Sequence, residues 1–212
     1  MVSKSLRKDL RGENFRKADL SGADLRLANL SLADLREANL SSADLTDAYL
    51  SETNLSGANF TDAILIDAHL ISANLSGAVL CSAYLTRADF GGADLSGADF
   101  SGAYLNYANL ISANLSGANL SRAKLGKADF GWANLIGADL SGASLIQADL
   151  RDANLSSADF SNATLIETKL NGAIIEDVKL DGARMDRGVA DHLIRLGCDI
   201  SSVIILFEKD GI

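Results

Sequence analysis

The chain contains few residues whose types and spacing could support catalysis. Its only histidines are His69 and His192, and its only cysteines are Cys81 and Cys198. Acid–base catalysis needs groups within hydrogen-bond reach of a common substrate, and the cysteines match no metal-ligand spacing and no nucleophile with a paired base. Aspartates are numerous, and two carboxylates can share acid–base chemistry. Whether they meet depends on the elements that position them.

Those elements follow from a repeat of five residues. From Leu10 to Met185 every fifth residue is large and apolar, which makes 36 consecutive units without an insertion. A period of five fits neither a helix, with 3.6 residues per turn, nor a long strand, with two. It fits a short extended segment followed by a corner. In the unit Ala-Asp-Leu-Ser-Gly, alanine and leucine then point inward, aspartate points outward, and serine and glycine form the bend.

The outward residues predict four sides per coil. Glycine occupies the second position after the apolar centre at residues 57, 77, 97, 117 and 137, a spacing of 20. Stacked at about 4.8 Å per coil, the units give nine coils and a rod of about 43 Å. Its interior would consist of leucine and phenylalanine ringed by alanine.

This geometry separates the groups that could do chemistry. Asp89, Asp94 and Asp99 fall on three successive sides of one coil and therefore diverge. His69 lies in an outward slot, about six coils from His192. The glycines are corners of a solenoid and not a phosphate-binding loop. The sequence predicts no enzyme, no cofactor and no metal site.

The unit A-[D/N]-[L/F]-[S/T/R]-x, as in residues 23–27 and 138–142, resembles the repeat of the pentapeptide repeat family. The resemblance covers residues 8–187, and it implies an all-β fold, a right-handed quadrilateral β-helix. The density of A-D-L-S-G units resembles that of cyanobacterial members, most of which have no implied biochemical activity. Some relatives mimic duplex DNA, bind type II topoisomerases such as DNA gyrase and protect them from quinolones.

The β-helix is predicted over residues 10–187, and both of its ends need caps, since an open coil exposes backbone edges and apolar side chains. Residues 1–9 are expected to cover the first coil. The C-terminal cap is expected in residues 188–212. There Asp186 would cap a short helix that runs through Leu196.

The segment from Ile200 to Phe207 is predicted to be a strand or an apolar tail. It would either fold over the last coil or pair with a second copy of the chain. The candidate dimer contacts are Val203, Ile204, Ile205, Leu206 and Phe207. This apolar run is too short to cross a bilayer. The N-terminus lacks the apolar core of a signal peptide, so a cytoplasmic location is expected.

Outward slots that break the polar pattern predict a protein-interaction patch around one edge of the rod. Its candidate residues are Ile64, Ile66, His69, Ile71, Tyr84, Tyr104, Tyr107 and Ile111. Exposed apolar clusters often mark interfaces, and tyrosine is favoured at interface centres. Alternatively, these side chains only stack between coils and protect the rod. The sequence leaves both interpretations open. Trp132, farther along, is expected to be a lone exposed aromatic residue.

These observations favour a non-enzymatic scaffold that binds another protein, as yet unidentified, through its side. The net charge of −9 disfavours direct binding to nucleic acids and to anionic membranes.

The alternative function is a DNA mimic that binds gyrase. About 43 Å of duplex carries about 25 negative charges, well above the charge of this chain. The aspartates are also divided between opposite sides of the rod, with Asp89, Asp129 and Asp149 on one and Asp99, Asp139 and Asp159 on the other.

Overall fold

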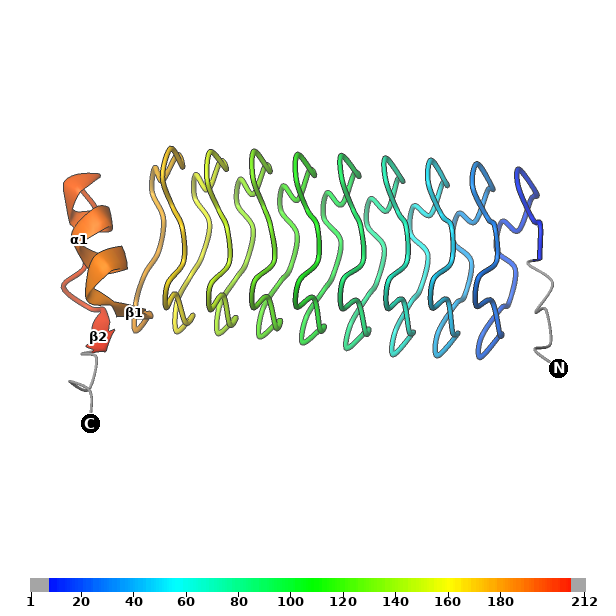
Figure 1. Ribbon diagram of the computed structural model, residues 1–212, viewed down its shortest axis with the longest axis horizontal. Helices are drawn as coiled ribbons and strands as arrows, with labels where there is room; N and C mark the ends of the chain where they lie inside the picture. The colour runs from blue at the N-terminus through cyan, green and yellow to red at the C-terminus, as the bar shows by residue number, and fades with distance from the viewer. Residues whose placement is uncertain (1–7, 207–212) are drawn as a thin grey trace, which may run out of the picture.

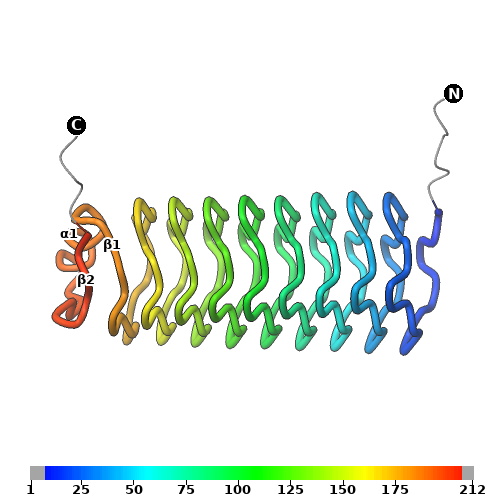
Figure 2. The backbone as a smooth tube through the Cα atoms, turned by 90° about the horizontal axis from the view of Figure 1, so that it is seen from below, coloured from blue at the N-terminus to red at the C-terminus, as the bar shows by residue number. Residues whose placement is uncertain are grey.

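The computed structural model describes residues 8–206, which form a straight rod of stacked coils (Figure 1 and Figure 2). Each outward residue before a centre forms a parallel bridge with the residue twenty positions later, from Asp9–Asn29 to Thr164–Arg184. Four units therefore complete one coil, as the spacing of the corner glycines predicts. Most of the expected N-terminal cover, residues 1–7, lies outside the described residues, and Lys8 and Asp9 already belong to the first coil.

Backbone hydrogen bonds satisfy four of the five amides in a unit. In residues 113–117, Asn114 N–H donates to the preceding coil, and Leu115 and Gly117 N–H donate to the next one, with distances of 2.7–2.9 Å. Ala113 N–H closes the preceding corner on Leu110 O. The fifth amide, Ser116 N–H, donates to the side-chain oxygen of Asn114.

This fifth bond explains the recurrent Asp and Asn before each centre. A side-chain oxygen of this residue accepts the N–H two residues later, an Asx turn that closes the corner. The pattern recurs at most corners, for example Ser96 N–H to Asp94 at 3.1 Å. The aspartates are therefore structural acceptors and do more than keep the rod soluble.

The second residue after each centre adopts the left-handed conformation. Glycine does so without penalty, as at Gly117 with φ of 64°. Most of the other corner residues are polar, but Leu27, Leu32, Tyr107 and Trp132 take the same conformation with φ of 57–63°. A bulky side chain in this region is unfavourable.

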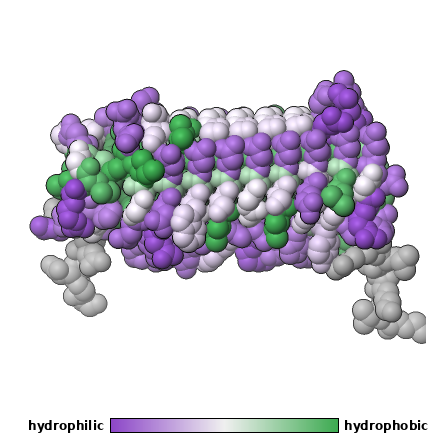
Figure 3. Space-filling model, turned by 90° about the horizontal axis from the view of Figure 1, so that it is seen from above, coloured by the Kyte–Doolittle hydropathy of each residue, from purple (hydrophilic) through white to green (hydrophobic). Residues whose placement is uncertain are grey.

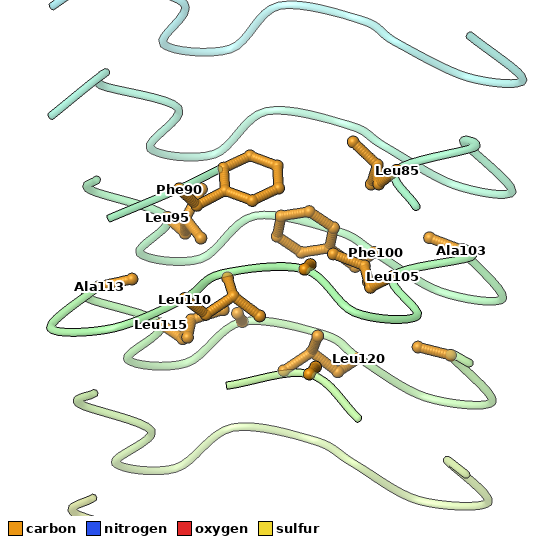
Figure 4. Close-up of a cluster of buried hydrophobic side chains, with 14 of the residues drawn as sticks. Leu85, Phe90, Leu95, Phe100, Ala103, Leu105, Leu110, Ala113, Leu115 and Leu120 are labelled. Carbon is orange, nitrogen blue, oxygen red and sulfur yellow. The ribbon is translucent and has the colours of Figure 1, made fainter. Parts of the chain in front are cut away.

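The interior is a continuous column of leucine, phenylalanine and alanine. Leu95, Leu105 and Leu115 have no exposed surface, and Phe90 and Phe100 meet edge to face with ring centroids 6.1 Å apart (Figure 4). Thr53 replaces an inward alanine and donates its hydroxyl to Leu30 O at 2.9 Å. Burial of each large side chain contributes about 1.5–3 kcal/mol before chain entropy is subtracted.

A helix and two short strands close the C-terminal end (Figure 1). Strand β1 spans Arg184–Asp186, helix α1 spans Arg187–Arg195, and strand β2 spans Ile204–Leu206. Asp186 caps α1 by accepting Val189 N–H at 3.1 Å, and α1 buries Val189, Ala190 and Leu193. Strand β2 pairs with β1 in parallel, Arg184 opposite Ile204, so the chain returns after the helix in the register of the coils.

Two opposite sides of the rod differ in their outward residues. In each coil, the tyrosine side is a segment of seven residues, for example residues 101–107. The apolar centres of these segments run from Leu25 to Met185 in steps of twenty. The asparagine side consists of segments such as 111–117, with centres from Phe15 to Ile175. On the side seen in Figure 3, rows of like residues run along the rod and isolated hydrophobic residues interrupt them.

Candidate protein-interaction surface

Tyr84 and Tyr104 lie at the centre of the predicted patch. The bridges Ile64–Tyr84 and Tyr84–Tyr104 place the three residues in consecutive coils of the tyrosine side. The two tyrosine rings are stacked, with centroids 5.0 Å apart and planes 2° from parallel. Both side chains remain exposed, at 45% and 40%. The two tyrosines therefore stack between coils, with their facing ring surfaces in contact, and a large part of each side chain remains accessible.

Tyr107 occupies the adjoining corner. It is 56% exposed, and its φ of 62° places it in the left-handed region. The ammonium group of Lys127, in the next coil, lies 5.3 Å from the centroid of its ring. This cation–π contact is worth about 0.5–1 kcal/mol at an exposed site.

The exposed part of the patch is smaller than the sequence predicts. Ile71 is exposed, whereas Ile64, Ile66, His69 and Ile111 are half-buried. The ring of His69 stacks on Tyr49 in the preceding coil, with centroids 4.9 Å apart. Neighbouring coils are close enough for long outward side chains to cover one another, and this covering depends on rotamers that the pattern does not specify.

Most corners of the tyrosine side lack the Asx turns found on the asparagine side. Asp24 and Asp44 close the first two of its corners. The next six corners have Ile64, Tyr84, Tyr104, Lys124, Ser144 and Thr164 in this position. Of the corner amides that follow them, Gly126 N–H donates to the side chain of Asn106 at 3.2 Å, and none donates to the residue two places earlier. A typical hydrogen bond contributes about 0.5–1.5 kcal/mol, so these residues forgo stabilisation.

Several exposed apolar residues lie outside the predicted patch. Trp132 is 66% exposed at its corner, as expected, and Ile136 is 43% exposed on the asparagine side. Ile146 is 41% exposed on the tyrosine side. Sequence reasoning missed Ile136 and Ile146, although both replace the usual serine immediately after a centre, and that substitution is the signal that identifies them.

Cations neutralise many carboxylates along the rod. Hydrogen bonding to Arg36 lowers the pKa of Asp34 to about 2. The carboxylate of Asp149, which is buried, contacts Arg151 at 2.7 Å. Ion pairs of this kind involve nine carboxylates of the described residues, so part of the negative charge is neutralised locally.

The groups that could do chemistry are dispersed. Burial raises the pKa of the Cys81 thiol, which donates to Asp99 at 3.1 Å, so the thiol is not an activated nucleophile. His192 lies in α1, and its Nε2 is 3.3 Å from Leu170 O. Within residues 8–206, no cluster of three His, Cys, Asp or Glu side chains could hold a metal ion. In the same part of the chain, no helix is long and apolar enough to cross a membrane.

The candidate dimer contacts lie at the capped end. Ile204 is 51% exposed, and Val203, Ile205 and Leu206 are half-buried. Strand β2 pairs with β1, so the alternative in which this segment folds over the last coil is the one observed. Phe207 lies outside the described residues.

Comparison with protein-family models finds pentapeptide repeats in overlapping segments from residue 14 to residue 187. The chain belongs to the pentapeptide repeat family. Family members of known structure are right-handed quadrilateral β-helices. A comparison with curated protein sequences gives no significant match.

Two solved pentapeptide repeat structures resemble most of the chain. HetL, a protein involved in heterocyst differentiation regulation from the cyanobacterium Nostoc sp. strain PCC 7120, is 36% identical, with a TM-score of 0.52. The match covers 84% of this chain and 92% of HetL. Trypsin-treated QnrB1, a plasmid-mediated fluoroquinolone resistance protein, is 25% identical, with a TM-score of 0.60, over 92% of this chain and 98% of QnrB1.

Proposed function

We propose that the protein is a non-enzymatic scaffold that binds another protein through its tyrosine side. The observation that carries the proposal is the set of exposed tyrosines, Tyr84, Tyr104 and Tyr107. Tyrosine provides a large contact area and loses little side-chain entropy on binding, because it has only two rotatable side-chain angles. The similarity to HetL, whose role is regulatory, agrees with a function in binding.

Stacking between coils accounts for only part of this surface. It explains Tyr84 and Tyr104, whose rings contact each other. Tyr107 contacts Lys127 of the next coil, but 56% of its surface stays exposed. Its left-handed conformation is shared by Leu27, Leu32 and Trp132, so what distinguishes Tyr107 is its place on the same side of the rod as Tyr84 and Tyr104.

The test is capture of partners from a cyanobacterial lysate by the immobilised protein. The triple variant Tyr84→Ser, Tyr104→Ser and Tyr107→Ser is expected to lose the captured partner. The matched control removes exposed apolar residues from the asparagine side, through Trp132→Ser, Ile136→Ser and Ile174→Ser, and is expected to retain it. Identical partners for all three proteins would contradict the proposal.

The similarity to QnrB1 over nearly its whole length favours a second candidate, a DNA mimic that binds gyrase. The local pairing of carboxylates with arginines speaks against it, because a DNA mimic needs unpaired charge along one face. A supercoiling assay with and without a quinolone decides the question. No effect on gyrase at a large molar excess of this protein would eliminate the candidate.

We also propose self-association through residues 203–206, which is compatible with either function. Strand β2 is the last strand of the rod within the described residues, and it pairs with β1 along one of its two edges. Ile204, in β2, is half exposed. An unpaired edge strand is a template for pairing with another chain. The substitution Ile204→Lys is expected to convert a dimer to a monomer in sedimentation or light scattering. A monomeric unmodified protein would rule the dimer out.

A further inference from the structure

The tyrosine side is positively charged in its middle part, although the whole chain has a net charge of −9. Its four middle segments contain no aspartate or glutamate and four cations, Arg87, Arg122, Lys124 and Lys127. These segments are residues 81–87, 101–107, 121–127 and 141–147. The matching segments of the asparagine side contain one carboxylate, Asp94, and no cation. They are residues 71–77, 91–97, 111–117 and 131–137.

Three of these cations have no carboxylate partner. Arg87 pairs with Asp67. Among the described residues, no carboxylate lies within 4 Å of the charged groups of Arg122, Lys124 or Lys127, and all three side chains are exposed. The cations of the N-terminal coils behave differently, as in the pair of Arg26 with Asp24 at 2.7 Å. We call Arg122, Lys124 and Lys127 the cationic row.

The cationic row crosses the full width of the tyrosine side, directly beside the tyrosines. Arg122 and Lys127 are at its two corners, and Lys124 is between them, bridged through its backbone to Tyr104. Lys127 covers the ring of Tyr107.

Arg122 borders a shallow hollow with Ser101, Gly102, Ser121, Asp139 and Ser141. The carboxylate of Asp139 lines this hollow and accepts Ser141 N–H at 2.8 Å, and it lies more than 4 Å from the guanidinium of Arg122. The row therefore presents three positive charges without an ion-pair partner to whatever contacts the tyrosines.

We infer that the partner presents an acidic protein segment, which contacts the tyrosine side with its carboxylates over the cationic row. This inference rests on the proposed function. Charge complementarity of this kind increases the association rate and suppresses wrong partners.

A nucleic acid fits this surface less well than a protein segment. Single-stranded nucleic acids bind through bases stacked on aromatic faces. Here the facing surfaces of Tyr84 and Tyr104 cover each other, and Lys127 lies over Tyr107.

The test measures fluorescence anisotropy of three labelled probes of equal length at low and at physiological ionic strength. The probes are a glutamate-rich peptide with central leucines, the same peptide with lysines in place of glutamates, and oligothymidylate. We expect the glutamate peptide to bind best, and more weakly as salt increases. The variant Arg122→Ser, Lys124→Ser and Lys127→Ser should weaken its binding by about tenfold, since each exposed pair contributes a few-fold.

A matched control removes three cations elsewhere, through Arg16→Ser, Lys17→Ser and Arg26→Ser, and should change the affinity by less than about twofold. Circular dichroism checks that both variants are folded. The inference is overturned if the glutamate peptide does not bind, if the two triple variants behave alike, or if either other probe binds as tightly.

Capture from the lysate distinguishes this inference from the proposed function. If the partner is lost in the tyrosine variant but retained in the variant of the cationic row, the scaffold function stands and the acidic segment is wrong. If the partner is lost in both, both proposals are supported. If neither variant changes the captured partners, both are wrong.

Discussion

The tyrosine side and the asparagine side share one backbone and one core but close their corners differently. On the asparagine side, eight consecutive corners, from Asn14 to Asn154, have a side-chain oxygen that accepts the corner amide. On the tyrosine side only the first two corners, at Asp24 and Asp44, are closed in this way. In the middle coils, the inward residues of both sides are equally buried. Outward residues can therefore change without altering the coil, at a local cost in stability.

The asparagines also connect successive coils. Asn114 donates to Asp94 at 3.1 Å, and Asn134 donates to Asn114 at 3.1 Å. Each of these oxygens also accepts a corner amide, so the ladder joins corner closure to stacking. On the tyrosine side the ring stack of Tyr84 and Tyr104 supplies part of this connection. The difference indicates that the asparagine side serves mainly to stabilise the rod, and the tyrosine side departs from that role.

The largest expected loss of stability tests whether the inward residues of the two sides contribute equally to the core. Leu105→Ala on the tyrosine side and Leu115→Ala on the asparagine side should each lower the free energy of unfolding by about 2–5 kcal/mol, because both side chains are fully buried. Denaturant unfolding monitored by circular dichroism measures both. A loss below about 1 kcal/mol at only one position would show that the interiors differ.

The next largest loss of stability tests how much the side-chain acceptors of the corners contribute on each side. Asn114→Tyr removes a corner acceptor and two ladder bonds, and should cost about 1–3 kcal/mol. The reverse change, Tyr104→Asn, gains a corner acceptor and loses the ring stack, worth about 0.5–1.5 kcal/mol. Its stability should stay within about 1 kcal/mol of the unmodified protein. Equal losses in denaturant unfolding would mean that Tyr104 supports the rod as much as Asn114 does.

A smaller effect tests the left-handed corners. Gly117→Ala should lower stability by about 1 kcal/mol, because an added Cβ meets no atom within 4 Å and the conformational penalty acts alone. Tyr107→Gly should raise stability or leave it unchanged, since it relieves the same penalty but loses the contact with Lys127. A clear loss for Tyr107→Gly in thermal unfolding would show that this tyrosine is structural.

The smallest effect concerns pH. Hydrogen bonding to Arg36 lowers the pKa of Asp34, on the asparagine side, from its usual value of 3.8 to about 2. A lowered carboxyl pKa in the folded state means that its stabilisation is complete above pH 3.8 and is lost as the pH falls through about 2. Carboxyl carbon NMR should show titration of Asp34 near pH 2. Arg36→Gln should return it toward 3.8, and an unchanged midpoint would contradict this cause.

Much of the fold can be predicted from the repeat because the repeat is local. The alternation of Ala23, Asp24 and Leu25 determines what points inward, and twenty-residue spacing determines which residues stack. The acceptor role of Asp24 and its equivalents was missed, although the two-residue offset to the corner amide is also local.

The candidate site was predictable only in part. The column of Ile64, Tyr84 and Tyr104 follows from spacing, as does the corner position of Tyr107. The half-burial of Ile64, which the pattern places in an outward slot, depends on how long side chains of adjacent coils pack over one another.

The five-residue period alone is sufficient for the coil, because each unit bends in the same way and buries the same two residues wherever it occurs. Tertiary structure decides the contacts between coils and at the capped end. It stacks the ring of His69 on Tyr49, returns Ile204 to the register of Arg184 after α1, and leaves Lys124 without a carboxylate. These outcomes depend on side-chain rotamers and distances between residues of different coils, which a repeat of identical backbone units does not specify.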